Sequence, residues 1–279
     1  MQVIREKKCE CRNGYAEIGI YHNSGDNLHK LPRAERKKLT VPKQKKLNDE
    51  YSRRTMRLLM NNNFTVGDYH ISPTYNSASL PCDNEAATKE LHRYIRKLRS
   101  LYKKNGYELK YLHVTENGDK NGRVHHHILV NNVGISRDVL EDLWGHGQVN
   151  VDRLQPDRDG TFNRLANYLH KSAANAEKHS RVWNCSRNLR RPIERTSDNE
   201  ISKKQLAALV EAKRNDELKA VVERIYKGYT MIEAYVSENE VTGLPYAHLR
   251  LMKKAVLQSN AIISKGVYYE SSGYTKAIP

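Results

Sequence analysis

The chain has 279 residues, which is enough for one large domain or two smaller ones with a hydrophobic core. It carries 48 Lys and Arg against 32 Asp and Glu, a formal net charge of +16, and 38% of its residues are hydrophobic. No apolar run approaches the roughly 18–20 residues that a membrane span needs, which excludes a transmembrane protein. The N-terminus also lacks the apolar core of a secretory signal, so we expect a cytoplasmic protein.

The charge and the cysteines narrow the class of protein further. A strongly basic chain favours a polyanionic partner, because basic side chains on phosphates release condensed counterions. Nucleic acid is the first expectation, and acidic membrane lipid is the alternative. The four cysteines are too scattered for a disulfide framework and form no Cys-x2–4-Cys pair, so we interpret them as reduced thiols and expect no zinc site: Cys9, Cys11, Cys82 and Cys185.

The pattern of apolar residues predicts alternating strands and helices. The clearest helix covers 84–104, where an apolar stripe faces a basic one and Gly106 follows as a stop signal. Two Asn-Gly pairs within 117–122 favour a hairpin connection between the strands on either side. In chain order the elements are a strand at 15–21, a helix at 47–60, a strand at 64–75 broken near Pro73, a helix at 84–104, strands at 108–116 and 123–131, a helix at 136–144, a strand at 147–152, and helices at 160–175 and near 201–213. This order favours an α+β fold, in which an antiparallel sheet carries helices on one face, plus a smaller mixed C-terminal region.

Three consecutive histidines lie inside the apolar strand 123–131. Because strand side chains alternate, His125 and His127 share one face, with Cα atoms roughly 6.5–7 Å apart, and His126 points the other way. Glu116 ends the preceding strand and supplies the oxygen that a hard or borderline divalent ion requires. The alternative is a polar strand face whose histidines bond to their neighbours. Two imidazoles on one face opposite a carboxylate favour the metal site.

A tyrosine and a lysine lie one turn apart on the helix 160–175. Tyr168 and Lys171 are neighbours on one helix face, and a lysine ammonium favours the phenolate form of a nearby tyrosine. Tyr-x-x-Lys by itself is a weak signal, since such a pair is common on amphipathic helices. The segment 183–191 adds arginines around a tryptophan, which suits single-stranded DNA, although a basic surface loop with an anchoring tryptophan explains the pattern equally well.

The order of these motifs resembles a known family. The string Gly122-Arg-Val-His125-His126-His127-Ile-Leu-Val130, followed by Asn167-Tyr168-Leu-His-Lys171, resembles HUH endonucleases, and more narrowly the rolling-circle replication initiator (Rep) proteins of small bacterial plasmids and phages. Further resemblance lies in 63–68, in 110–116 and in 183–189, whereas the last 85 or so residues carry little that matches. Where relatives usually have an apolar residue between the two histidines, this chain has His126.

The resemblance implies a sheet-and-helix nicking domain that cleaves single-stranded origin DNA and forms a covalent phosphotyrosine. It assigns Glu116, His125 and His127 as ligands of a divalent ion, Mn²⁺ or Mg²⁺, with Tyr168 as nucleophile and Lys171 as the basic residue beside it. We expect the DNA-binding side chains to be Arg164, Trp183, Arg187, Arg190 and Arg191.

These expectations define a functional hypothesis and its alternatives. We expect a replication initiator that leaves a 3′-hydroxyl primer and a 5′-phosphotyrosine link and later rejoins the DNA. A relaxase or single-tyrosine transposase of the same superfamily is one alternative, and a non-catalytic nucleic-acid-binding regulator is another. The expected partners are single-stranded or hairpin origin DNA, a host helicase and polymerase and a second copy of the chain, with no membrane.

The same resemblance suggests a division of the chain. Residues 1–60 are expected to form a basic strand and helix, as part of the nicking domain or as its DNA-binding extension. Residues 61–195 are expected to form the HUH endonuclease core, and residues 196–279 a helical or mixed region whose role is not predicted.

Overall fold

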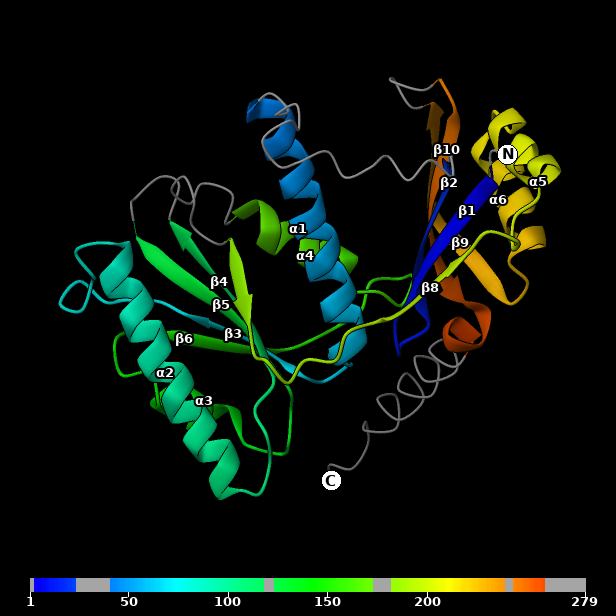
Figure 1. Cartoon of the computed structure of the whole chain (residues 1–279). Coiled ribbons are helices and arrows are strands. Elements are labelled where there is room, and N and C mark those ends of the chain that lie inside the picture. Colours follow the sequence, from blue (N-terminus) through cyan, green and yellow to red (C-terminus); the bar gives the residue numbers. More distant parts are fainter. Residues whose placement is uncertain (1–2, 24–40, 118–122, 173–181, 239–242, 259–279) are drawn as a thin grey trace, which may run out of the picture. The chain divides into compact units, whose positions relative to one another are not determined.

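The computed structural model describes residues 3–23, 41–117, 123–172, 182–238 and 243–258. It divides into two compact units. The central unit consists of Leu47–Asp157 and Phe162–Arg191, and the terminal unit consists of Met1–Lys46, Arg158–Thr161 and Pro192–Pro279. Each unit is built around its own five-stranded antiparallel sheet (Figure 1). None of the described helices is both long enough and apolar enough to cross a membrane.

The sheet of the central unit has the strand order β6-β3-β5-β4-β7. Every neighbouring pair is antiparallel, and β5 lies in the middle. The strands are β3 (Tyr69–Pro73), β4 (Tyr111–Asn117), β5 (Val124–Val130), β6 (Val149–Arg153) and β7 (Trp183–Cys185). The turn between β4 and β5 lies outside the described residues, but the pairing of these two strands confirms the predicted hairpin.

One face of this sheet is covered by α2 (Asn84–Lys104) and α3 (Arg137–Asp142). The bounds predicted for α2 are confirmed. The helix begins where the Asp83 carboxylate accepts the N–H of Ala86 at 2.7 Å, and Gly106 follows it with a φ of 80°. Its apolar stripe, including Leu91 and Leu98, packs against Ile128 and Val130 of β5. This cluster is the larger of the two cores of the central unit.

The opposite face is covered by α1 (Val41–Asn63) and α4 (Asn163–Ser172). The Asn61 side chain of α1 accepts the N–H of Phe162 at 3.1 Å and donates to Asn163 Oδ1 at 3.0 Å, so α1 fixes the start of α4. The α+β class with an antiparallel sheet is therefore confirmed. The helices α2 and α3 provide the predicted one-face packing, and the apolar stripes of α1 and α4 cover the second face.

The sheet of the terminal unit joins strands from the two ends of the sequence, in the order β8-β1-β2-β10-β9. Its strands are β1 (Val3–Glu10), β2 (Tyr15–Asn23), β8 (Ile193–Ser197), β9 (Tyr229–Glu238) and β10 (Pro245–Lys253), and α5 (Lys203–Glu211) and α6 (Asn215–Ile225) pack against one face of it. This division differs from the three consecutive ranges expected from the sequence, because β1 pairs with β8 and β2 pairs with β10. Strand β1 was not predicted, since five of its eight residues are charged.

The core of the central unit yields a test of the packing. Leu98 is fully buried in α2, whereas its neighbour Arg99 is exposed. We expect Leu98→Ala to destabilise the unit by about 2–5 kcal/mol, because the truncation leaves a cavity. The matched Arg99→Ala should stay within about 0.5 kcal/mol of the native chain. Thermal unfolding followed by circular dichroism measures both, and equal melting temperatures for the two variants would contradict this packing.

Candidate metal centre and adjacent tyrosine

The candidate metal centre is built by the pairing of β4 with β5. The register places Glu116 opposite His125 and Val114 opposite His127. Residues opposite each other in an antiparallel pair point to the same face of the sheet. His125 and His127 therefore share a face with Leu129, whose side chain lies in the core formed with α1 and α4. The carboxylate and both imidazoles meet on the side of the sheet that carries α4.

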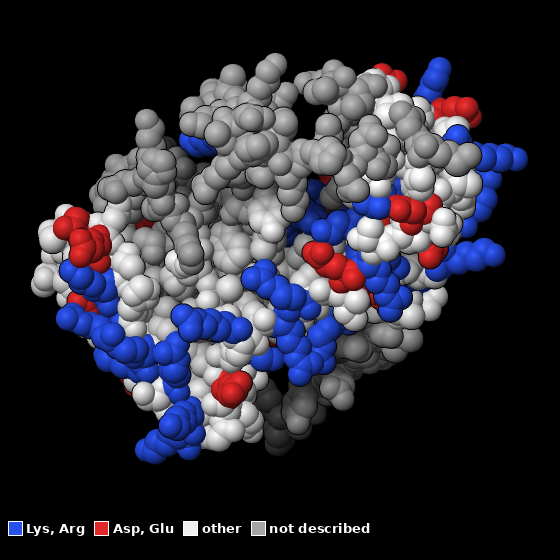
Figure 2. Space-filling model, viewed as in Figure 1, with Lys and Arg blue, Asp and Glu red and all other residues white. Residues whose placement is uncertain are grey.

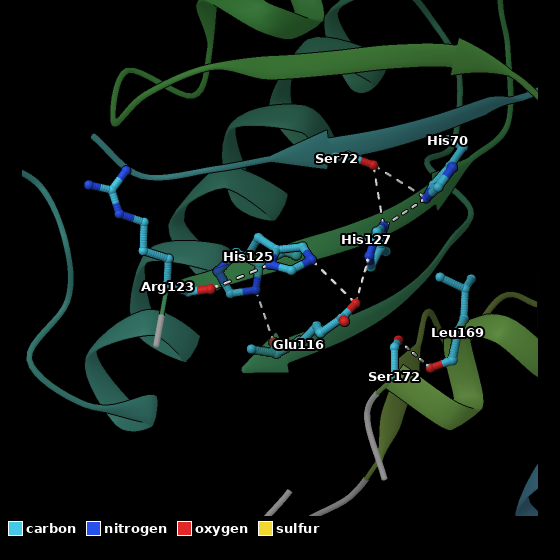
Figure 3. A network of polar contacts seen from close by, with 10 residues as sticks. His70, Ser72, Glu116, Arg123, His125, His127, Leu169 and Ser172 are labelled. Carbon is cyan, nitrogen blue, oxygen red and sulfur yellow. Dashed lines mark hydrogen bonds and ion pairs between the residues drawn. The ribbon is translucent and has the colours of Figure 1, made fainter. Parts of the chain in front are cut away.

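The three side chains converge on one carboxylate oxygen (Figure 3). Glu116 Oε2 lies 3.3 Å from His125 Nε2 and 3.2 Å from His127 Nε2. The three ligand atoms all lie within 4.8 Å of one another. The side chains of His127 and Glu116 are 8% and 15% exposed and that of His125 is 29% exposed, so the group lies at the surface yet is largely shielded. These residues, predicted from the sequence, form a cluster that could hold a metal ion.

The donor set agrees with a divalent ion. Imidazole nitrogens suit borderline metals and a carboxylate suits harder ones, so two of the former and one of the latter fit ions between these classes. Three protein ligands also leave positions for a substrate oxygen or for water. The geometry does not distinguish Mn²⁺ from Mg²⁺.

A fourth histidine, which the sequence analysis did not single out, supports the cluster from β3. His70 Nε2 lies 3.0 Å from His127 Nδ1, and the two rings stack with their centroids 5.1 Å apart. Ser72 Oγ lies 3.3 Å from the same His127 nitrogen. Burial lowers the pKa of His70 to about 4, with a further contribution from His127, so His70 is neutral at pH 7.

The contact with His70 selects one tautomer of His127. A metal ion on Nε2 needs that nitrogen unprotonated, so the proton of the neutral ring must lie on Nδ1. Nδ1 then donates to the neutral His70, whose Nε2 can accept. Burial also lowers the pKa of His127, although the bond to Glu116 opposes this effect. His70 is therefore placed to orient a metal ligand, as outer partners of metal-bound histidines commonly do.

His126 points to the opposite face, as strand alternation predicts. Its ring is fully buried, with Nε2 2.8 Å from the Tyr75 hydroxyl and Nδ1 2.9 Å from the Thr115 hydroxyl. Burial lowers its pKa to about 3. A histidine between the two ligands is accommodated because both of its nitrogens have partners in the core beneath α2.

Tyr168 lies beside the cluster on α4. Its ring centroid is 5.9 Å from that of His127, and the tyrosine remains 53% exposed. Ala166 and Leu169 bury the opposite side of α4, which leaves Tyr168 at the edge of the core. Partial burial and the charge of Glu116 both raise the pKa of the phenol. Lys171 follows three residues later on α4 with its side chain exposed.

The residues expected to bind DNA lie on α4 and after it. Arg164 is exposed on the first turn of α4, where its N–H donates to Asp157. Trp183 is half-buried, and its indole N–H donates to Ser52 Oγ at 3.0 Å, an anchoring contact. The side chains of Arg187, Arg190 and Arg191 are exposed.

The backbone of the arginine segment is held against α1. Asn62 donates to the carbonyl of Arg190 at 2.8 Å, and Asn63 accepts the Arg190 N–H at 2.7 Å. None of the interactions described for this segment or for Arg164 involves the metal cluster. The sequence-predicted site thus consists of a cluster and a tyrosine that the structure brings together, and a set of arginines that it leaves at the surface.

Comparison with known proteins supports a role in replication. Residues 68–173 match a family model for replication-associated proteins of the ORF2 type. This range extends from β3 to α4 and contains the metal cluster, His70, Tyr168 and Lys171. No curated protein and no solved structure matches the chain. The family match supports a replication initiator, and the cluster fits an endonuclease.

The contact between His70 and His127 can be tested by substitution. We expect His70→Phe to weaken Mn²⁺ binding about 10–100-fold, because an aromatic ring remains but the acceptor for His127 Nδ1 is lost. His92→Phe is the matched control, since His92 is exposed on α2. Isothermal titration calorimetry with Mn²⁺ measures both affinities. Native affinity in His70→Phe would show that the orienting contact has no role in metal binding.

Proposed function

We propose that the chain initiates replication by nicking single-stranded origin DNA, with Tyr168 as the nucleophile. The observation that carries the proposal is the position of the Tyr168 ring, 5.9 Å from a histidine of a three-residue metal cluster. A divalent ion held by Glu116, His125 and His127 would polarise a non-bridging phosphate oxygen and offset the charge of the transition state. The family match over the same residues supports DNA replication as the process.

The chemistry requires only one exchange of ester bonds. The Tyr168 oxygen attacks phosphorus and loses its proton, which the exposure of the phenol allows water to accept. As the new bond forms, the bond from phosphorus to the 3′ oxygen breaks, and that oxygen takes up a proton from solvent. The products are a free 3′-hydroxyl, which a polymerase can extend, and a 5′-phosphotyrosine that retains the bond for rejoining.

The electrostatics of the site couple the nucleophile to the cluster. The charge of Glu116 is one of the two causes that raise the pKa of Tyr168. When the carboxylate is neutralised by a bound cation, this contribution is lost and the phenolate becomes more accessible. Lys171, one turn along α4, adds positive charge on the same helix face.

A single tyrosine on α4 shapes the later steps. The helix contains no second tyrosine, so rejoining requires another attacking group, for which a second copy of the chain is the simplest source. The sequence has no Gly-x4-Gly-Lys-Ser/Thr motif, so duplex unwinding is assigned to a host helicase. These assignments rest on the proposed chemistry.

Two alternatives use the same residues differently. A relaxase or single-tyrosine transposase would share the cluster and Tyr168, and the match to a replication-associated family favours the initiator. A non-catalytic regulator would need neither a metal cluster nor an adjacent phenol. The convergence of Glu116, His125 and His127 on one point argues for catalysis.

Removal of the phenol tests the nucleophile. We expect Tyr168→Phe to lower the rate of cleavage by at least about 1,000-fold, as loss of a nucleophile does in other enzymes, while Mn²⁺ affinity stays unchanged. The substrate is a set of 3′-labelled single-stranded oligonucleotides that carry the origin, with Mn²⁺ present. Denaturing electrophoresis should show a labelled protein adduct for the native chain and none for the variant.

Tyr107→Phe is the matched control, because Tyr107 is an exposed tyrosine of the same unit. Equal cleavage by the native chain and Tyr168→Phe would exclude Tyr168 as nucleophile. Absence of cleavage and of an adduct with the native chain would favour the non-catalytic regulator.

Lys171 can be tested through the pH dependence of cleavage. We expect Lys171→Met to lower the rate about 10–100-fold at pH 7, because the phenolate loses a nearby positive charge. The defect should shrink as the pH rises towards 9, since a tyrosine with an ordinary pKa of about 10 then ionises more readily without help. The pH–rate profiles of Lys171→Met and of the exposed control Lys213→Met measure this. A defect that is independent of pH would contradict the role of Lys171 in ionising Tyr168.

A further inference from the structure

The outward face of α2 forms a continuous basic surface. Arg93, Arg96, Lys97 and Lys104 line a shallow hollow together with Leu101 and the end of α3 at Leu143. Their spacing of three, four and eleven residues from Arg93 places them on one side of the helix. At about 1.5 Å per residue, the row extends for roughly 16 Å. We call these four residues and this hollow the α2 basic face.

Most of the charge on this helix has no acidic partner. The acidic residues of α2 lie in its first two turns, where Glu85 pairs with Lys89 and Glu90 pairs with Arg93. The helix has no acidic residue after Glu90, and among the described residues no ion pair involves the basic ones that follow: Arg96, Lys97, Arg99, Lys103 and Lys104. Figure 2 shows the blue side chains gathered where Figure 1 draws α2, with few red ones among them.

The α2 basic face is separate from the metal cluster. Helix α2 packs on the sheet face that carries Ile128 and Val130, whereas His125 and His127 share the opposite face with Leu129. The full thickness of the sheet therefore lies between the two sites. A strand of DNA bound at the cluster does not account for a row of cations on this side.

The chemistry of the α2 basic face indicates phosphate contacts without base stacking. Proteins that hold single strands combine positive charge with exposed aromatic rings. The hollow has no aromatic lining, and the two central tyrosines of α2 point into the core, where Tyr94 donates to the Leu140 carbonyl and Tyr102 to the Asn131 carbonyl. Lys97 donates to the Leu143 carbonyl at 2.9 Å, which fixes its ammonium at the rim of the hollow.

We propose that the α2 basic face is a second DNA-binding surface, which holds the sugar–phosphate backbone of a duplex and does not read its sequence. It would keep double-stranded DNA on the side of the sheet opposite the strand that is cut. The proposal shares with the proposed function only the premise that DNA is the partner. Binding at the α2 basic face requires neither the metal cluster nor Tyr168.

The test measures duplex binding as a function of salt. The variant is Arg96→Gln/Lys97→Gln/Lys104→Gln, and the probe is a fluorescein-labelled 20-base-pair duplex followed by anisotropy. Each phosphate contact contributes about 0.9 to the slope of log K against log salt, so loss of three contacts should lower the slope by about 2.7 and the affinity about 10–100-fold. Cleavage of single-stranded oligonucleotides should remain within about threefold of native.

A matched variant controls for net charge. Lys203→Gln/Lys204→Gln/Lys213→Gln removes the same three charges from exposed positions of the terminal unit and should leave the slope within about 0.5 of native. Tyr168→Phe should bind the duplex as the native chain does, so failure of the nicking chemistry and failure of this proposal give different results. If the triple α2 variant unfolds, Arg96→Gln/Lys104→Gln keeps the Lys97 contact and should lower the slope by about 1.8.

Three results would overturn the proposal. The first is a native salt slope in the α2 variants, and the second is an equal loss in the terminal-unit control. The third is native duplex binding in the α2 variants together with lost binding to vesicles of phosphatidylcholine with 30% phosphatidylserine, which would assign the surface to an acidic membrane instead.

Discussion

The register between β4 and β5 is the constraint on which the site depends. With Glu116 opposite His125, the carboxylate and both imidazoles fall on one face within 4.8 Å of one another. A shift of one residue would move the histidines to the face that α2 covers and separate them from Glu116. The register is held by burial on both faces, because Leu129 packs under α1 and α4 while Ile128 and Val130 pack under α2.

Two helical layers give the two faces of β5 different tasks. On one face, α4 leaves Tyr168 at the edge of the core and beside His127, where it remains accessible. On the other face, α2 buries His126 and turns its basic side chains outward. The sheet thus holds a candidate reaction centre on one side and a strongly basic surface on the other. This arrangement agrees with a protein that handles both a single strand and the duplex beside it.

The parts of this structure that depend on local pattern could be predicted from the sequence. The spacing in 84–104 gives the bounds of α2, and strand alternation puts His125 and His127 on one face with His126 on the other. The proximity of Tyr168 to His127 followed from the resemblance of the motif order, since spacing alone does not bring α4 to β5.

The parts that depend on pairing between distant segments could not be predicted. His70 belongs to the site because β3 lies next to β5, and strand order is not written in a local pattern. A histidine and a serine two residues apart on a short strand were the available signal, but they lack a partner until that order is known. Strand β1 was missed for a similar reason, since its charged residues become a strand only by pairing with β2 and β8.

The account is tested most directly by a crystal structure of the chain grown with Mn²⁺, in which anomalous scattering locates the ion. We predict a peak about 2.0–2.3 Å from the Nε2 atoms of His125 and His127 and from a carboxylate oxygen of Glu116, on the sheet face that carries Tyr168. A peak at another group of residues, or no peak at a saturating concentration of Mn²⁺, would contradict the assignment of this cluster as the metal centre.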